Sequence, residues 1–312
     1  MEKRDPAMTV SVIIPTYNAK NELEALIERL KKQTLPFELV VIDSSSTDGT
    51  AEVGQTHADI FLSIDKADFD HGGTRTKAAK VASGEILVFL TQDALPTHEK
   101  TLERLVRLFK IPVIGAAYGN QIPYEHTSLF GRHLRSFNYP ETSCIRTAAD
   151  RPRYGIKTAF LSDSFAAYRR SVLEEIGWFK NGLIVGEDTY AGAKILLKGH
   201  ALAYCAEARV YHAHSYTVTE EFKRYFDIGV FHEREGWILE HFGKAEGEGR
   251  RYIFSELKYL FEHRAPHKIP EFILRNSVKY LGYTLGRHYT ALPKGVIKSL
   301  SMHKPWWAKQ AV

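Results

Sequence analysis

Hydrophobic positions along the first hundred residues follow two alternating spacings. Short apolar runs, typical of buried strands, occupy residues 9–14, 37–42, 60–64 and 85–90. Apolar side chains recur instead at helical spacing in residues 21–33, and residues 74–82 also fit a helix. This strand–helix alternation predicts an α/β protein with a mostly parallel, Rossmann-like central sheet and helices on both faces.

The rest of the chain falls into three parts. The α/β pattern returns as a strand at 160–168, helices at 171–176 and 188–198, and a strand at 201–211. Residues 119–157, rich in Tyr, Pro, Arg and His, predict a long functional loop. Beyond residue 218 the pattern is helical, with expected helices at 219–240, 250–263 and 270–290. We therefore expect an α/β domain over 1–218 and a helical C-terminal extension over 219–312.

Composition narrows the class of protein. The chain has 312 residues, of which 44% are hydrophobic and 25% charged, as in ordinary globular proteins. Two cysteines, Cys144 and Cys205, exclude a disulfide scaffold and a cysteine-rich zinc module. A membrane-spanning helix needs about 20 apolar residues, and the apolar runs here are only as long as strands. The N-terminus lacks an apolar leader, so we expect a cytoplasmic protein, and the net charge of +5 favours anionic partners.

Acidic residues mark the ends of the expected strands. Asp43 ends the second strand, Asp48 follows in a turn-rich loop, and Asp93 comes just after the fourth strand. Ligands of parallel sheets bind beyond the carboxyl ends of the strands, so this edge is the candidate site. Asp43 suits a contact to a pyrimidine N3–H or a ribose, or else a hydrogen bond to its own turn.

Six short motifs carry a family resemblance. Residues 11–18 (SVIIPTYN) and 41–50 (VIDSSSTDGT) resemble the nucleotide-binding phrases of family 2 glycosyltransferases, which have the GT-A fold. The other four resemble, in order, the family's G-x-x-R-N segment, metal-binding D-x-D, catalytic E-D and closing histidine: residues 71–76 (HGGTRT), 89–93 (FLTQD), 186–188 (GED) and 210–215 (VYHAHS). With residues 119–123 and 224–229, the series is most similar to bacterial rhamnosyltransferases of polysaccharide assembly. Thr91 stands where the first acid of D-x-D is expected, and Thr76 replaces the Asn.

The resemblance implies an inverting, metal-dependent sugar transfer. Asp93 and His212 would hold Mg²⁺ or Mn²⁺, with His214 as the alternative histidine. Asp188 would be the catalytic base, supported by Glu187; by themselves, both acids also fit a helix N-terminus. The residues expected to bind the nucleotide sugar are Pro15, Thr16, Asn18, Asp43, Arg75, Gln92, Asp93 and Asp163.

The implied substrates are a nucleoside-diphosphate sugar, with dTDP-L-rhamnose favoured over a UDP-sugar, and a glycan or polyprenyl-linked acceptor. No nucleic-acid partner is expected. Lysines interleaved with Trp306 and Trp307 near the C-terminus suit a peripheral contact with the inner face of a membrane. Two alternatives stay open: a metal-dependent phosphoester hydrolase using Asp93, Asp188 and His212, and a non-catalytic basic binding module.

Overall fold

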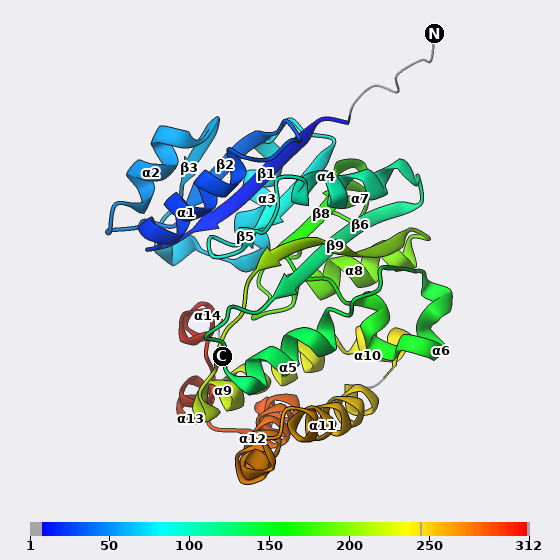
Figure 1. Ribbon diagram of the computed structural model, residues 1–312. Helices are drawn as coiled ribbons and strands as arrows, with labels where there is room; N and C mark the ends of the chain where they lie inside the picture. Colours follow the sequence, from blue (N-terminus) through cyan, green and yellow to red (C-terminus); the bar gives the residue numbers. More distant parts are fainter. Residues whose placement is uncertain (1–7, 244, 311–312) are drawn as a thin grey trace.

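A single mixed sheet organises the protein in the computed structural model, which describes residues 8–243 and 245–310. The main path of the sheet runs β3-β2-β1-β4-β8-β6-β9-β5, and β7 pairs with β9 (Figure 1). The strands are β1 Val10–Thr16, β2 Glu38–Asp43, β3 Ile60–Ser63, β4 Ile86–Leu90, β5 Leu95–Pro96, β6 Ile114–Ile122, β7 Cys144–Arg146, β8 Phe165–Arg169 and β9 Ala201–Tyr211. Strands β1 to β4 pair in parallel, as do β6 and β9, while β5, β7 and β8 pair antiparallel. The mostly parallel sheet expected from the sequence is confirmed.

Helices cover both faces of this sheet. Those within the first 217 residues are α1 Lys20–Leu30, α2 Thr50–His57, α3 His71–Val81, α4 Thr101–Val106, α5 Leu129–Asn138, α6 Arg151–Tyr154, α7 Arg170–Glu175 and α8 Glu187–Leu197. Alternate side chains of one strand enter different cores: Val12 and Ile14 pack with α1 and α4, whereas Ile13 packs with α3 and α8. Burial on both faces explains why these strands are continuous apolar runs.

The antiparallel strand β8 brings distant residues to one edge of the sheet. Its first residue, Phe165, pairs with Leu90, the last residue of β4. Asp163, just before β8, therefore lies at the same edge as Asp93, just after β4. Strands β6 and β9 run parallel beside β8, and their register shifts between Gly119 and Asn120. A Cβ on Gly119 would come within 2.3 Å of the Phe165 ring, so a side chain there would force the strands apart.

The expectation of a long loop over residues 119–157 is wrong. Strand β6 continues to Ile122, and the segment then forms α5, β7 and α6. One face of α5 packs against the C-terminal helices: Phe130 is buried with Leu260 and Phe272, and His133 Nε2 lies 2.9 Å from Ser255 Oγ. These tertiary contacts stabilise a helix whose composition resembles that of a loop.

The C-terminal segment is helical, as expected. Its helices are α9 Val218–Arg234, α10 Gly236–Phe242, α11 Ala245–Glu262, α12 Ile269–Arg287, α13 Lys294–Leu300 and α14 Lys304–Lys309. They gather in the lower half of Figure 1. Phe226, Val230 and Phe231 of α9 belong to the same hydrophobic cluster as the sheet residues, so the segment packs directly on the α/β part.

The tryptophans near the C-terminus do not face solvent. Trp307 is 2% exposed, and the Trp306 indole N–H donates to the Gly182 carbonyl at 3.0 Å. Both rings therefore pack inside the protein and are not exposed for the membrane contact expected of them. Within the described residues, no helix has the length and hydrophobicity to cross a bilayer.

Candidate active site

A cleft of about 570 Å³ lies between the edge of the sheet and helix α9. Its walls include Asp163, Glu187 and Asp188 from loops and helix starts, and His212 and His214 from the segment after β9. Helix α9 contributes Arg224, Asp227 and Phe231. The cleft is therefore built by both the α/β part and the helical segment.

The backbone before α8 presents the two acids of the E-D motif. Gly186 is in the left-handed conformation, with φ of 83°, and helix α8 begins at Glu187. The Asp188 carboxylate accepts the Thr189 N–H at 2.6 Å and the Asp163 N–H at 3.4 Å. Glu187 is buried, whereas Asp188 is only half-buried. Of the two acids, Asp188 is thus the more accessible to a substrate in the cleft.

A buried ionic network lies beside Asp188. The Arg75 guanidinium is 3.0 Å from Glu187 and 3.5 Å from Asp163, and the Tyr168 hydroxyl donates to Asp163 at 2.6 Å. Arg75 is therefore held by two carboxylates in the cleft wall.

The acids of this network have pKa values shifted in different directions. Burial and the negative charge of Glu187 raise the pKa of Asp188 to about 6. Burial likewise raises the pKa of Asp163 well above its ordinary value. Burial opposes ionisation of Glu187 too, but Arg75 and His71 lower its pKa. Perturbed pKa values of this kind are typical of catalytic sites, and a base near 6 is ionised at neutral pH.

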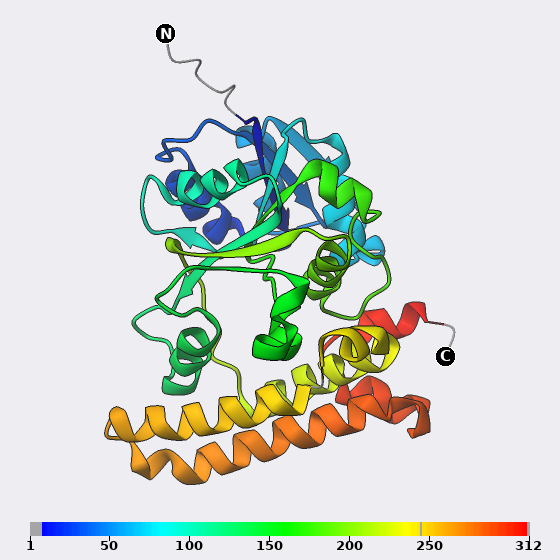
Figure 2. The same ribbon diagram turned by 90° about the vertical axis from the view of Figure 1, so that its right-hand side faces the viewer.

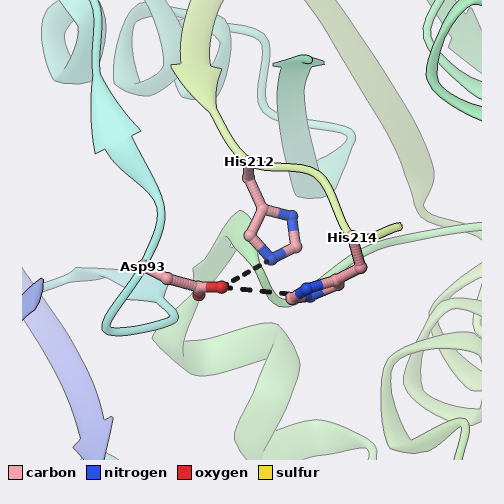
Figure 3. A group of neighbouring side chains, drawn as sticks. All are labelled: Asp93, His212 and His214. Atoms are coloured by element: carbon pink, nitrogen blue, oxygen red, sulfur yellow. Dashed lines mark ion pairs between the residues drawn. The ribbon is translucent and has the colours of Figure 1, made fainter. Parts of the chain in front are cut away.

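Asp93, His212 and His214 form a candidate metal site. Asp93 Oδ2 lies 3.5 Å from His212 Nε2 and 3.9 Å from His214 Nε2, and one ligand atom from each residue fits within a 4.8 Å group (Figure 3). His212 is buried, and burial together with the neighbouring His212 lowers the pKa of His214 to about 4. One carboxylate and two imidazole side chains are a donor set that suits a divalent cation.

A buried amide orients His212. Its Nδ1 lies 2.8 Å from Gln121 Oε1, while the Gln121 amide group donates to Ser162 Oγ at 2.8 Å. Because the amide oxygen only accepts, Nδ1 carries the proton, so in the neutral imidazole Nε2 presents its lone pair toward Asp93. The donor set therefore fits the metal implied by the sequence.

The expected nucleotide-binding residues meet at the ends of β1 and β2. Thr16 Oγ1 donates to Asp43 at 3.0 Å, and Asp43 also accepts the Ser46 N–H at 2.8 Å and its hydroxyl at 2.5 Å. Asn18, with φ of 44°, accepts the Thr47 N–H at 2.9 Å. Asp43 therefore accepts hydrogen bonds both from the end of β1 and from the loop at 44–47, and so connects the two.

Gln92 links that edge to Asp93. Its side-chain oxygen accepts the Tyr17 N–H at 2.9 Å, so the loop after β1 is tied to the loop after β4. Pro15 lies within β1, where it pairs with Ile42 of β2. The structure thus forms two groups from the expected residues, one at β1 and β2 and one around the cleft. The sequence analysis did not identify Gln121, Tyr168 and Arg224 as site residues. Gln121 and Arg224 lie in segments 119–123 and 224–229, which contributed to the family resemblance.

Comparisons with known proteins identify the family of the chain. The family model "Glycosyl transferase family 2" matches residues 11–177. The chain is 44% identical over 303 residues to the O-antigen chain rhamnosyltransferase RfbN of Salmonella typhimurium, covering 96% of each protein. It is 42% identical over 300 residues to the O-antigen chain rhamnosyltransferase WbaN of Salmonella anatum, covering 95% of each.

Solved structures show the fold. A mannosyltransferase of Pyrobaculum calidifontis, in complex with GDP-Man and Mn²⁺, superposes with a TM-score of 0.59 at 20% identity, covering 99% of this chain and 92% of that one. TarS of Staphylococcus aureus, in complex with UDP-GlcNAc, gives 0.58 at 21% identity, covering 95% and 84%. The GT-A fold expected from the motifs is confirmed. The chain belongs to glycosyltransferase family 2 and is a glycosyltransferase.

Proposed function

We propose that this enzyme transfers L-rhamnose from dTDP-L-rhamnose to a lipid-linked glycan during synthesis of a cell-surface polysaccharide. The observation that carries the proposal is the likeness to two O-antigen chain rhamnosyltransferases, each above 40% identity and over at least 95% of both chains. The hydrolase alternative has no support among these relatives. In this proposal the reaction takes place at the cytoplasmic face of the membrane.

In this proposal Asp188 removes the proton of the acceptor hydroxyl as it attacks the anomeric carbon. The attack comes from the face opposite the departing diphosphate, so the configuration at that carbon inverts. Support comes from the access of Asp188 to the cleft and from its pKa of about 6. Glu187 keeps Arg75 in place beside it.

Asp93, His212 and His214 are proposed to hold Mn²⁺ or Mg²⁺. Such a cation, when bound, neutralises charge that develops on the leaving diphosphate. The nucleotide itself is assigned to the edge formed by Pro15, Thr16, Asn18 and Asp43, and the diphosphate to the side near Gln92 and Asp93.

Donor choice tests the proposal. Purified enzyme is incubated with Mn²⁺, a lipid-linked acceptor extract and, in parallel, dTDP-L-rhamnose, UDP-glucose or GDP-mannose. We expect acceptor-dependent consumption of dTDP-L-rhamnose alone, and loss of turnover in Asp188→Asn. Preference for another donor would contradict the assigned sugar. Release of free sugar without acceptor would instead favour hydrolysis.

A further inference from the structure

Helix α12 exposes an apolar stripe opposite its packed face. Its buried residues recur every three to four positions, and two of them, Gly282 and Gly286, press against α9: a Cβ on either would lie within 2.4 Å of an α9 carbonyl oxygen. On other faces of α12, Ile273, Leu274, Tyr280 and Leu281 are each at least 51% exposed. These four residues form two adjacent pairs about two helical turns apart, so they lie on the same side of α12.

Helix α11 lies beside α12 and has an exposed stripe of its own. Phe254 is 71% exposed and Phe261 57% exposed. The stripe also includes the cations Arg250, Arg251 and Lys258, which are one turn or less from these rings. The opposite face, with Tyr252 and Glu256, packs inward. Figure 2 shows the two helices running alongside each other across one end of the molecule.

The exposed charge on this hairpin is mostly positive, although Arg251 and Lys258 lie 3.7 and 3.5 Å from Glu248 and Glu262. Between residues 250 and 268 the exposed side chains include Arg250, Arg251, Lys258 and Arg264. Two acids occur in the same segment, of which Glu256 is fully buried and only Glu262 is exposed. Exposed aromatic and aliphatic residues interleaved with cations are typical of helices that lie on an anionic bilayer. A second copy of the chain fits less well, because a symmetric contact would bring the same cations together.

The hairpin also has a direct connection to the cleft. Lys279 of α12, on the packed face, lines the cleft and lies 3.6 Å from Glu221 of α9. The exposed stripe of the same helix begins one residue later with Tyr280. A surface that engages lipid through the outer face of α12 would therefore hold the cleft within reach of the bilayer.

We propose that the exposed stripes of α11 and α12 dock on an anionic lipid bilayer. This inference rests on the proposed function, in which the acceptor is linked to a lipid of the bilayer. It assigns the contact to the helical hairpin instead of the C-terminal tail, whose tryptophans are buried.

Sedimentation with vesicles tests the assignment. The probes are vesicles of phosphatidylcholine alone and of phosphatidylcholine with 30–40% phosphatidylglycerol, roughly matching a bacterial anionic surface. Wild type should bind the anionic vesicles in a salt-sensitive way. Phe254→Ser with Phe261→Ser and Leu274→Ser should weaken binding at least about tenfold. Arg250→Gln with Arg251→Gln and Lys258→Gln should weaken it roughly fivefold for each cation removed.

Matched controls separate the hairpin from other surfaces. Ile111→Ser with Val113→Ser alters equally apolar, exposed positions before β6, and Lys294→Gln with Lys298→Gln alters the tail; both should bind vesicles like wild type. Transfer to a water-soluble acceptor glycan should be unchanged in the hairpin variants, so a failure of the proposed reaction shows itself separately from a failure of docking. Absence of vesicle binding by wild type, or wild-type binding by the hairpin variants, would overturn the proposal. So would a wild-type dimer in sedimentation velocity that the Phe254 and Phe261 changes dissociate, because the stripes would then bind a second copy.

Discussion

Nδ1 of His212 lies 2.8 Å from Oε1 of Gln121, and both groups are buried. The contact depends on pairing between β6 and β9, since the His212 N–H continues the ladder by donating to the Ile122 carbonyl at 3.1 Å. It leaves Nε2 of His212 free to act as a ligand beside Asp93. The orientation of the proposed metal site is therefore set by a strand that carries none of its ligands.

Removing this orienting contact should weaken metal binding. Gln121→Leu leaves His212 free to adopt the other tautomer, and loss of such an outer contact typically lowers metal affinity about 10–100-fold. Gln121→Glu keeps an acceptor for Nδ1 and should retain most of the affinity. Calorimetric titration with Mn²⁺ in the presence of dTDP measures both, and equal affinities in Leu and Glu variants would contradict the role of Gln121.

Turnover should require a divalent cation and should favour Mn²⁺ over Mg²⁺. Two imidazoles make the donor set softer than an all-oxygen site, and Mg²⁺ prefers oxygen ligands. Activity in a donor-consumption assay should disappear after chelation and return more fully with Mn²⁺ than with Mg²⁺. Asp93→Asn should raise the Mn²⁺ concentration needed. Full activity after exhaustive chelation would show that the three residues have another role.

Asp188→Asn should lower kcat by roughly 10²–10⁴, the usual contribution of a positioned base, with little change in donor affinity. Asn keeps the size of the side chain but cannot accept the proton. Glu187→Gln is the matched variant in the same motif. It should reduce kcat less, because the Glu187 carboxylate is paired with Arg75. Turnover of Asp188→Asn within about threefold of wild type would make Asp163 the first alternative base.

The pH profile of kcat/KM should fall on the acidic side with a midpoint near 6. The sign follows from the role: a base works only when ionised, and burial with the charge of Glu187 raises the pKa of Asp188 to about 6. Activity should thus be lost as pH drops through this value. In Glu187→Gln the midpoint should move to lower pH, because the neighbouring negative charge is gone. A midpoint that stays in place or rises would mean that another group is titrating.

Asp43→Ala should weaken dTDP binding by roughly 1–3 kcal/mol, the range for losing buried hydrogen-bond partners. Asp43 holds Ser46 and Thr16, so the loss would act on the loop as well as on the nucleotide. Ser46→Ala is the control that disturbs the loop but keeps the carboxylate, and its effect should be smaller. Unchanged dTDP affinity of Asp43→Ala in calorimetry would remove Asp43 from the nucleotide site.

The sheet could be predicted from the sequence because its strands are buried on both faces. Val12, Ile13 and Ile14 are all fully buried, so the pattern of the chain directly reflects the layers around β1. The segment at 119–157 was misjudged because α5 depends on partners far along the chain. His133 of α5 reads as a polar loop residue, yet it is buried against Ser255 of α11.

The same distinction applies to the site. Asp93 follows a strand and Asp188 lies at the start of a helix. Motifs and the local pattern of the sequence reveal both positions. Gln121 acquires its role only through the shifted register between β6 and β9, which no local pattern shows. Trp306 and Trp307 beside lysines have the same pattern whether they face lipid or pack inside. The fold decides between these possibilities by supplying the Gly182 carbonyl as a partner.

The most direct test is the anomeric configuration of the product. Transfer from dTDP-L-rhamnose to a defined acceptor glycan is followed by NMR in the presence of Mn²⁺, with wild type and Asp188→Asn side by side. The account predicts a rhamnosyl product whose anomeric configuration is opposite to that of the donor, formed by wild type and at least about 100-fold more slowly by Asp188→Asn. Retention of configuration, or equal rates for the two proteins, would contradict it.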